Sequence, residues 1–301
     1  MIYKNFNDLV KKVRQTKEPK KVAVVAAQDE NVLKGVFRAK EDNIVVPFLI
    51  GNKHEIIKIT KSIGGNLDKD MIFDTADDKS SAVKAVELVR SGDVDLIMKG
   101  KIQTADLLRE VVDKERGLRT GRIMSHMVLH EIPNYSKLLT VTDGGMAMYP
   151  TLPEKRQIIE NAVEALIKMG YQKPKVAVLA AVEKVNSNMP ESVDADALKK
   201  MYITGEIKDC IIEGPISYDL TMSEKSAKIK GYKSPIVGDA DILLVPNITT
   251  GNILGKCLQY SAGAKMAGFV VGARVPIVLT SRGETSEEKY LSLVISAAAV
   301  Y

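Results

Sequence analysis

Lys21 to Ala27 reads KVAVVAA, a short, continuous apolar run rich in valine. Such a run is typical of a strand that is buried on both faces of a sheet. Two similar runs follow it, IVVPFLI at Ile44 to Ile50 and DLIMK at Asp95 to Lys99. The stretches around these runs are amphipathic, and we expect helices at Asn31 to Lys40, Glu55 to Ser62, Ser80 to Arg90 and Thr104 to Lys114. This alternation predicts an α/β fold with a largely parallel sheet flanked by helices.

The second half of the chain repeats this pattern. Apolar runs predict strands at Lys175 to Val182, Cys210 to Glu213, Asp241 to Val245, Gly268 to Val271 and Val275 to Thr280. Amphipathic stretches predict helices at Pro153 to Met169, Ser192 to Thr204 and Asn252 to Met266. At 301 residues, the chain has room for two domains or for one large α/β unit with a cleft. No segment rich in proline, glycine or serine divides the halves, so any boundary is expected where the chain crosses between strands.

The composition argues against several classes of protein. Apolar residues make up 45% and charged residues 27%, and no run approaches the roughly 18 apolar residues of a membrane span. The N-terminus has no apolar signal region, so we expect a soluble, cytoplasmic protein with no membrane partner. Cys210 and Cys257 have no zinc-type spacing, and we expect no metal. The net charge of +5 is spread along the chain, which is compatible with a small anionic substrate and not typical of a nucleic-acid partner.

Pro246 to Lys256, PNITTGNILGK, follows the apolar run DILLV and opens the helix that we expect after it. Free backbone N–H groups and the positive end of the helix dipole favour an anion at such a point. The alternative is that a threonine or the asparagine of TTGN, Thr249 to Asn252, only caps the helix. The segment is not a nucleotide-binding P-loop, because only three residues separate its glycines and Cys257 replaces the magnesium-binding hydroxyl.

Thr280 to Gly283, TSRG, forms a second strand-to-helix turn after the run VPIVLT. A serine hydroxyl, a guanidinium group and a nearby carboxylate can bind phosphate, stabilise developing negative charge and accept a proton. The alternative is specific, since Thr285 to Glu288 fits a capping box in which the glutamate satisfies an N–H group at the helix start.

Other chemical signatures are weak. There is no G-x-G-x-x-G turn for a dinucleotide and no G-x-S-x-G element of a hydrolase. The histidines His54, His126 and His130 are scattered, and a structural role is expected for each. The alternative for Ser125-His126 is that it lines a pocket, because it follows the glycine-containing segment Gly117 to Arg122. Arg109 lies in the predicted helix TADLLREVV, where an arginine usually faces solvent.

Taken together, the turns and several further segments resemble the phosphate acetyltransferase and phosphate butyryltransferase family, and their order and spacing are most similar to its butyryltransferases. The resemblance spans the whole chain. Its segments are Ala27 to Glu30, Met98 to Gly100, Thr104 to Arg109, Gly117 to Ser125, Thr142-Asp143, Ala181 to Pro190, Gly214-Pro215 with Asp219, PNITTGNILGK and LTSRG.

The resemblance implies two α/β domains with a cleft between them, similar in architecture to isocitrate and isopropylmalate dehydrogenases. Residues 1–121 with 273–301 would form the domain that carries the Ser-Arg motif, and residues 122–272 the domain that carries the TGN turn. The active site would lie in the cleft, and the protein would be a homodimer or a higher homo-oligomer. The implied reaction is reversible, acyl-CoA plus phosphate giving acyl phosphate plus CoA. Coenzyme A is a co-substrate, and no cofactor or metal is permanently bound.

The resemblance also implies roles for individual residues. The catalytic residues would be Ser281 and Arg282, which hold the acyl and phosphoryl groups, and Glu288, which acts as base toward the CoA thiol. A CoA thiol has a pKa near about 8.5, so a positioned carboxylate helps to form the thiolate at neutral pH. Substrate and phosphate binding would fall to Gly100, Thr104, Arg109, Asp143, Asp219, Thr250, Gly251 and Asn252.

Two points limit what the resemblance assigns. Glu287 lies one residue nearer than Glu288 and competes with it for the role of base. Acetyl-specific relatives carry an arginine after the glutamine in the TGN helix, whereas Gln259 is followed here by Tyr260. Butyryl is the expected acyl group, with acetyl or branched short chains as alternatives. More distant alternatives are an NAD-dependent dehydrogenase and a CoA-binding sensor without catalytic activity.

Overall fold

The computed structural model describes residues 2–300 except 17, 67 and 282, and of Lys69 only the backbone. The chain forms two compact units. We call residues 6–122 with 267–301 the flanking unit and residues 1–5 with 123–266 the central unit. Over the range that the structure describes, no helix is both long and apolar enough to cross a membrane.

The flanking unit has a mostly parallel sheet in the order β3-β2-β1-β4-β11-β10. The first five of these strands run parallel, and β10 is antiparallel to β11. Their bounds are β1 (Lys20–Val25), β2 (Val45–Gly51), β3 (Ile72–Asp74), β4 (Leu96–Lys99), β10 (Lys265–Val271) and β11 (Ile277–Val278). The last four residues of β1 and all of β4 are buried, which confirms the prediction from the run KVAVVAA.

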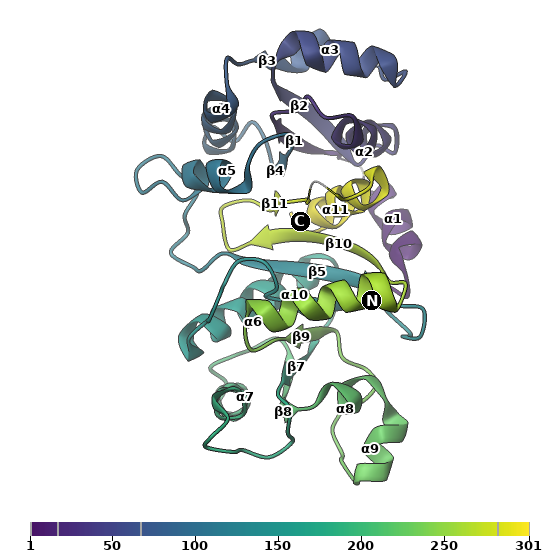
Figure 1. Ribbon diagram of the computed structural model, residues 1–301, viewed down its shortest axis with the longest axis vertical. Coiled ribbons are helices and arrows are strands. Elements are labelled where there is room, and N and C mark those ends of the chain that lie inside the picture. Colours follow the sequence, from purple (N-terminus) through teal and green to yellow (C-terminus); the bar gives the residue numbers. More distant parts are fainter. Residues whose placement is uncertain (1, 17, 67, 282, 301) are drawn as a thin grey trace. The chain divides into compact units, whose positions relative to one another are not determined.

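Helices pack on this sheet and begin at polar caps. Asp29, Asn52 and Asp77 accept hydrogen bonds from the first turns of the helices that follow them. The helices are α1 (Phe6–Arg14), α2 (Glu30–Glu41), α3 (Lys53–Ser62), α4 (Asp78–Arg90), α5 (Thr104–Val111) and α11 (Ser286–Ala298), with a 3-10 turn at Lys69–Met71. Helix α11 is buried on all sides from Lys289 onward and packs against α1 and α2 (Figure 1).

The central unit has its own mostly parallel sheet in the order β5-β6-β9-β7-β8. Only β5 and β6 pair in antiparallel fashion. Its strands are β5 (Ser125–Glu131), β6 (Leu139–Thr142), β7 (Lys175–Leu179), β8 (Ile211–Ile216) and β9 (Ile242–Leu244). Its helices are α6 (Leu152–Lys168), α7 (Pro190–Ile203), α8 (Tyr218–Met222), α9 (Glu224–Lys230) and α10 (Ile248–Lys256), followed by a π-helical turn at Cys257–Ser261. Figure 1 shows α10, which contacts β6.

The predicted α/β fold is confirmed, but some element bounds are wrong. The strand expected over Val275 to Thr280 is limited to Ile277–Val278. The helix expected from Asn252 begins earlier, at Ile248, so that TTGN lies inside the first turn and not before it. β5 and β6 were not expected at all, because their alternating polar residues made no continuous apolar run.

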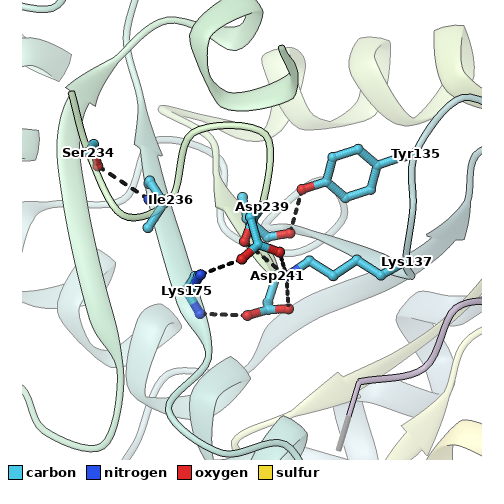
Figure 2. A network of polar contacts seen from close by, with 8 residues as sticks. Tyr135, Lys137, Lys175, Ser234, Ile236, Asp239 and Asp241 are labelled. Carbon is cyan, nitrogen blue, oxygen red and sulfur yellow. Dashed lines mark hydrogen bonds and ion pairs between the residues drawn. The ribbon is translucent and has the colours of Figure 1, made fainter. Parts of the chain in front are cut away.

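The amino ends of the central strands are held by an ion network, in which Lys137 and Asp241 are buried (Figure 2). The Lys137 ammonium, 3% exposed, lies 2.7 Å from carboxylate oxygens of both Asp239 and Asp241. Asp241 also accepts the backbone N–H of Lys175, and the Lys175 ammonium pairs with Asp239. Burial raises the pKa of Asp239, but Lys137 and Lys175 outweigh it and hold that pKa below its ordinary value. The amino edge of this sheet is therefore internally neutralised.

Candidate active site

The carboxyl ends of β4 and β11 meet at one edge of the flanking sheet. The two strands are parallel neighbours, with Val278 in register with Met98. Gly100 directly follows β4, and its backbone N–H bonds the carbonyl of Val25 on β1 at 2.8 Å. A Cβ at Gly100 would overlap main-chain oxygens at the end of β1, so this position requires a glycine.

The Ser281 turn connects β11 to α11 at this same edge. Ser281 is exposed, and its backbone N–H donates to a carboxylate oxygen of Glu284 at 2.7 Å. Thr285 caps α11, and Glu288 accepts hydrogen bonds from both the N–H and the hydroxyl of Thr285, at 2.7 and 2.9 Å. The capping box is therefore present. It fixes the Glu288 carboxylate at the helix start and does not by itself exclude a second role for it.

Two further residues were considered for this turn, Arg282 and the competing acid Glu287. Arg282 lies outside the described residues. Glu287, the competing acid, forms an ion pair with Arg38 of α2. That pair lies beside Tyr290, over whose ring the Arg38 guanidinium is stacked at 3.9 Å. Glu287 therefore takes part in the contact between α2 and α11, whereas Glu288 belongs to the Ser281 turn.

Lys289 also reaches the Ser281 turn, and the sequence analysis did not single it out. Its side chain is buried, with 3% exposed, and its ammonium donates to the Ser281 carbonyl at 3.1 Å and the Thr280 hydroxyl at 3.3 Å. The available signal was a lysine that directly precedes the apolar stretch YLSLVISAA, where a charge is expensive to bury.

Thr104 and Arg109 lie on α5, the helix that follows β4. Both are exposed. Arg109 forms an ion pair with Asp106 one turn earlier, at 2.8 Å, with its side chain 69% exposed. This is the solvent-facing arrangement that the sequence offered as the ordinary alternative for Arg109.

In the central unit, α10 is capped by a residue that was not among the expected caps. Asn247 accepts the backbone N–H of Thr250 at 3.0 Å and its hydroxyl at 3.2 Å. The N–H of Ile248 bonds the carbonyl of Met148. Of the first three helical N–H groups, only that of Thr249 has no partner among the described residues. The helix start thus offers an anion fewer donors than the sequence implied.

Gly251 packs α10 onto the loop after β6. A Cβ at Gly251 would lie 2.7 Å from the Cα of Gly144 and 2.8 Å from the carbonyl oxygen of Asp143. Gly251 is buried, while Thr250 and Asn252 beside it are exposed. The structure therefore brings Asp143 and the TGN segment together and gives Gly251 a close-packing role.

Asp143 organises that loop. Its carboxylate, 2% exposed, accepts backbone N–H groups of Gly145, Met146 and Ala147 at 2.7 to 3.1 Å. It also accepts the N–H of His126 on β5 at 3.1 Å. Because these bonds use both oxygens, Asp143 holds the shape of the loop against which α10 packs.

Asp219 lies apart from Asp143. It follows β8, three strand spacings from β6 in the sheet, which amounts to about 14 Å. A hydrogen bond with the Ser217 hydroxyl, followed by the Lys230 ammonium, holds the pKa of Asp219 below its ordinary value. Lys230 also pairs with Glu183 at 3.0 Å. Asp219 belongs to this local cluster.

Two histidines, His126 and His130, lie on β5. His130 is 1% exposed, and burial lowers its pKa to about 4. Its Nε2 lies 3.7 Å from where a Cβ on Gly255 would stand. Burial also lowers the pKa of His126, whose Nδ1 lacks a hydrogen-bond partner among the described residues. Both rings are therefore neutral near pH 7, in keeping with the structural role expected of them.

The fold and site define a class of protein, an α/β enzyme with polar turns at the carboxyl ends of its parallel strands. Across the described residues, no group of three or more His, Cys, Asp or Glu side chains is arranged to hold a metal ion.

Residues 77–297 match the family model described as phosphate acetyl/butaryl transferase. The chain belongs to this family of acyltransferases. It is 43% identical to a phosphate butyryltransferase of Clostridium acetobutylicum, over 98% of this chain and 97% of that protein. It is 42% identical to a phosphate acetyltransferase of Thermotoga maritima, over 92% and 94% of the two chains. A crystal structure of a branched-chain phosphotransacylase from Enterococcus faecalis superimposes with a TM-score of 0.81 at 34% identity, covering 94% of this chain and 99% of that one. The resemblance inferred from the sequence is confirmed.

Proposed function

We propose that this protein is a phosphate butyryltransferase, which transfers a short-chain acyl group reversibly between CoA and inorganic phosphate. The observation that carries the proposal is the Ser281 turn. An exposed serine there follows a buried strand, and a carboxylate seven residues later is fixed at the start of α11. Family membership gives this geometry its chemical meaning.

The reaction can be written on these groups with atoms and charges balanced. In the direction of acyl-CoA formation, the Glu288 carboxylate takes the thiol proton of CoA, and the sulfur attacks the carbonyl carbon of the acyl phosphate. The carbon–sulfur bond forms, and the bond from that carbon to the phosphate oxygen breaks. The leaving phosphate takes up the proton that Glu288 received from the thiol, which restores the carboxylate. In this proposal Ser281 and Arg282 hold the acyl and phosphoryl groups during the step.

The binding roles of Gly100, Thr104, Arg109, Asp143, Asp219 and the TGN segment stay predictions. We favour Gly100 and Thr104, since they follow β4, the strand next to β11. Asp143 and Gly251 support the proposal indirectly, by shaping the loop beside α10. Coenzyme A acts as a co-substrate in this scheme, with no permanently bound cofactor.

The setting of the enzyme is also proposed. The family resemblance favours a cytoplasmic homodimer in butyrate metabolism and fermentation. Residues 1–121 with 273–301 and residues 122–272 are proposed as its two functional domains, with the active site in the cleft expected between them.

The choice of acyl group needs a direct experiment, because identities of 43% and 42% to butyryl and acetyl relatives do not separate them. One methylene changes discrimination by only about 1 to 3 kcal/mol, which a few pocket contacts supply. We would measure thiol release from acetyl-, butyryl- and isobutyryl-CoA, each with and without inorganic phosphate.

Phosphate-dependent release, fastest with butyryl-CoA, is the expected result. Release that does not depend on phosphate would identify a thioester hydrolase and overturn the proposal. A faster reaction with acetyl- or isobutyryl-CoA would keep the reaction and change the substrate. Binding of CoA without release in any arm would favour a sensor.

A further inference from the structure

Two of the buried lysines of this protein, Lys137 and Lys155, are neutralised by carboxylates. Lys137, 3% exposed, is paired with Asp239 and Asp241 at 2.7 Å each. Lys155, 6% exposed, is paired with Asp194 at 2.6 Å. This is the expected arrangement, because an unpaired ammonium loses its hydration on burial and regains little.

Lys289 departs from this pattern. It is buried as deeply as Lys137, yet within the described part of the chain its ammonium contacts only two neutral oxygens, the Ser281 carbonyl and the Thr280 hydroxyl. The nearest acids along α11 are turned to other partners, Glu287 to Arg38 and Glu288 to Thr285. Among the described residues, no carboxylate forms an ion pair with the Lys289 ammonium.

The surroundings add positive charge. Lys99, the last residue of β4, is 5% exposed and ends the strand that lies next to β11. Two buried lysines thus lie at the sheet edge where Ser281 is exposed. A bound anion at this turn would supply a negative charge close to the buried ammonium of Lys289.

We propose that Lys289 is a positioning residue of the Ser281 turn, which holds Thr280 and Ser281 in place and supplies positive charge for a phosphate or acyl phosphate bound there. This inference rests on the proposed function. The Thr280 hydroxyl accepts a hydrogen bond from the ammonium, so its own hydrogen is directed away from Lys289 and is polarised as a donor. The Ser281 carbonyl is fixed in the same way, which limits rotation of the turn that presents the serine side chain.

The test compares Lys289→Met with Lys137→Met, two substitutions of equally buried lysines with different partners. We would measure Tm of each protein in phosphate and in chloride at matched ionic strength, and KM for phosphate and for butyryl-CoA. Lys289→Met is expected to keep or raise Tm in chloride, because it removes a buried charge with no carboxylate partner. Lys137→Met should lower Tm, since it leaves the buried Asp241 carboxylate without its cation, but should keep the phosphate-induced rise in Tm.

The distinguishing result concerns phosphate. In Lys289→Met the phosphate-induced rise in Tm should disappear, and KM for phosphate should increase about tenfold or more while KM for butyryl-CoA stays within about twofold. Lys289→Gln separates the effect of charge from that of hydrogen bonding. It should lose as much phosphate affinity as Lys289→Met but show a smaller fall in kcat than that variant.

Three outcomes would contradict this inference or the proposed function. If Lys289→Met lowers Tm as Lys137→Met does and still responds to phosphate, Lys289 is a structural residue. A wild-type Tm that does not respond to phosphate also overturns the inference. If wild-type protein releases no CoA but its phosphate response depends on Lys289, the proposed function fails and the anion site stands.

Discussion

The starts of α10 and α11 are both strand-to-helix turns, but they are built from different chemistry. At α11, charged groups meet: Glu284 holds Ser281, Glu288 holds Thr285, and the Lys289 ammonium is buried below. At α10, the cap is the neutral amide of Asn247, and Gly251 of the helix packs against Gly144 of the loop after β6. Charge developing in a reaction is stabilised by preorganised charged groups and dipoles, whereas close backbone contact supplies shape. We therefore expect α11 variants to change rate and α10 variants to change stability.

The largest expected effect tests the charged side of this comparison. Glu288→Gln should lower kcat by about 100-fold, because an amide cannot take the thiol proton. The free energy of unfolding should change by less than about 1 kcal/mol, since glutamine also serves in a capping box. Turnover measured by CoA release, together with urea unfolding, checks both parts.

Glu287→Gln is the matched control, with the same charge change one residue away. Its ion pair with Arg38 involves side chains that are each about half exposed, so its loss should cost less than about 1 kcal/mol. Its kcat should stay near that of the wild type. If Glu287→Gln loses activity and Glu288→Gln does not, the base is Glu287 and Glu288 is only a cap.

The next effect concerns the neutral His130 and is measured through the pH dependence of stability. The folded-state pKa of His130 is about 4, below its ordinary value of 6.5. The unfolded chain therefore takes up the proton first, and stability falls as pH drops from about 6.5 to about 4. The loss attributable to His130 is about 3 kcal/mol.

The measurement is the unfolding free energy of wild type and His130→Phe between pH 7.5 and 4. The variant should lose about 3 kcal/mol less than the wild type over this range. His54→Gln, at a side chain that is 86% exposed, should follow the wild-type curve. Parallel curves for wild type and His130→Phe would show that His130 takes up its proton in the folded protein as readily as in the unfolded chain.

A smaller effect tests the glycine contact at α10. Gly251→Ala should destabilise the protein by about 1 to 3 kcal/mol, because its Cβ would stand 2.7 Å from the Cα of Gly144. Gly255→Ala, one turn later, meets only His130 Nε2 at 3.7 Å and should be neutral or stabilising by up to about 1 kcal/mol. Equal unfolding free energies for the two variants would contradict the packing role of Gly251.

The smallest expected effect comes from a substitution that places a charge at the neutral cap of α10. Asn247→Asp keeps the capping oxygen and adds a negative charge at the helix start, which should stabilise the protein by about 0.3 to 1 kcal/mol. If an anionic substrate also binds at this turn, KM for phosphate or butyryl-CoA should rise in the same variant. An unchanged KM for both would assign the α10 turn to shape alone.

Much of the fold was readable from the sequence because it depends on local patterns. The runs KVAVVAA and DLIMK became β1 and β4, and the capping-box signal at Thr285 and Glu288 is present as predicted. The hairpin of β5 and β6 was missed, since its polar residues find partners only in the folded unit. An example is Thr142, whose hydroxyl donates to the backbone carbonyl of His126.

The candidate site was only partly readable for the same reason. Family motifs located Ser281, Glu288 and Gly251, but not the partners that define their surroundings. Gly251 requires a glycine because Gly144 lies against it, and these residues are far apart along the chain. Asp219, which the motif order grouped with Asp143, follows β8, three strands away from β6 in the same sheet.

By itself, the sequence determined the α/β class, the family and the positions of the two turns, because apolar periodicity, helix caps and motif order are properties of neighbouring residues. Tertiary structure decided which groups at those turns are satisfied and which are not. In the folded protein, Glu287 pairs with Arg38 and Asn247 caps α10. Lys289 is buried beside Ser281, with no carboxylate partner among the described residues. Burial and pairing depend on elements that meet only after folding. These two properties determine the free-energy cost of burying a charged group and whether that group can bind a ligand.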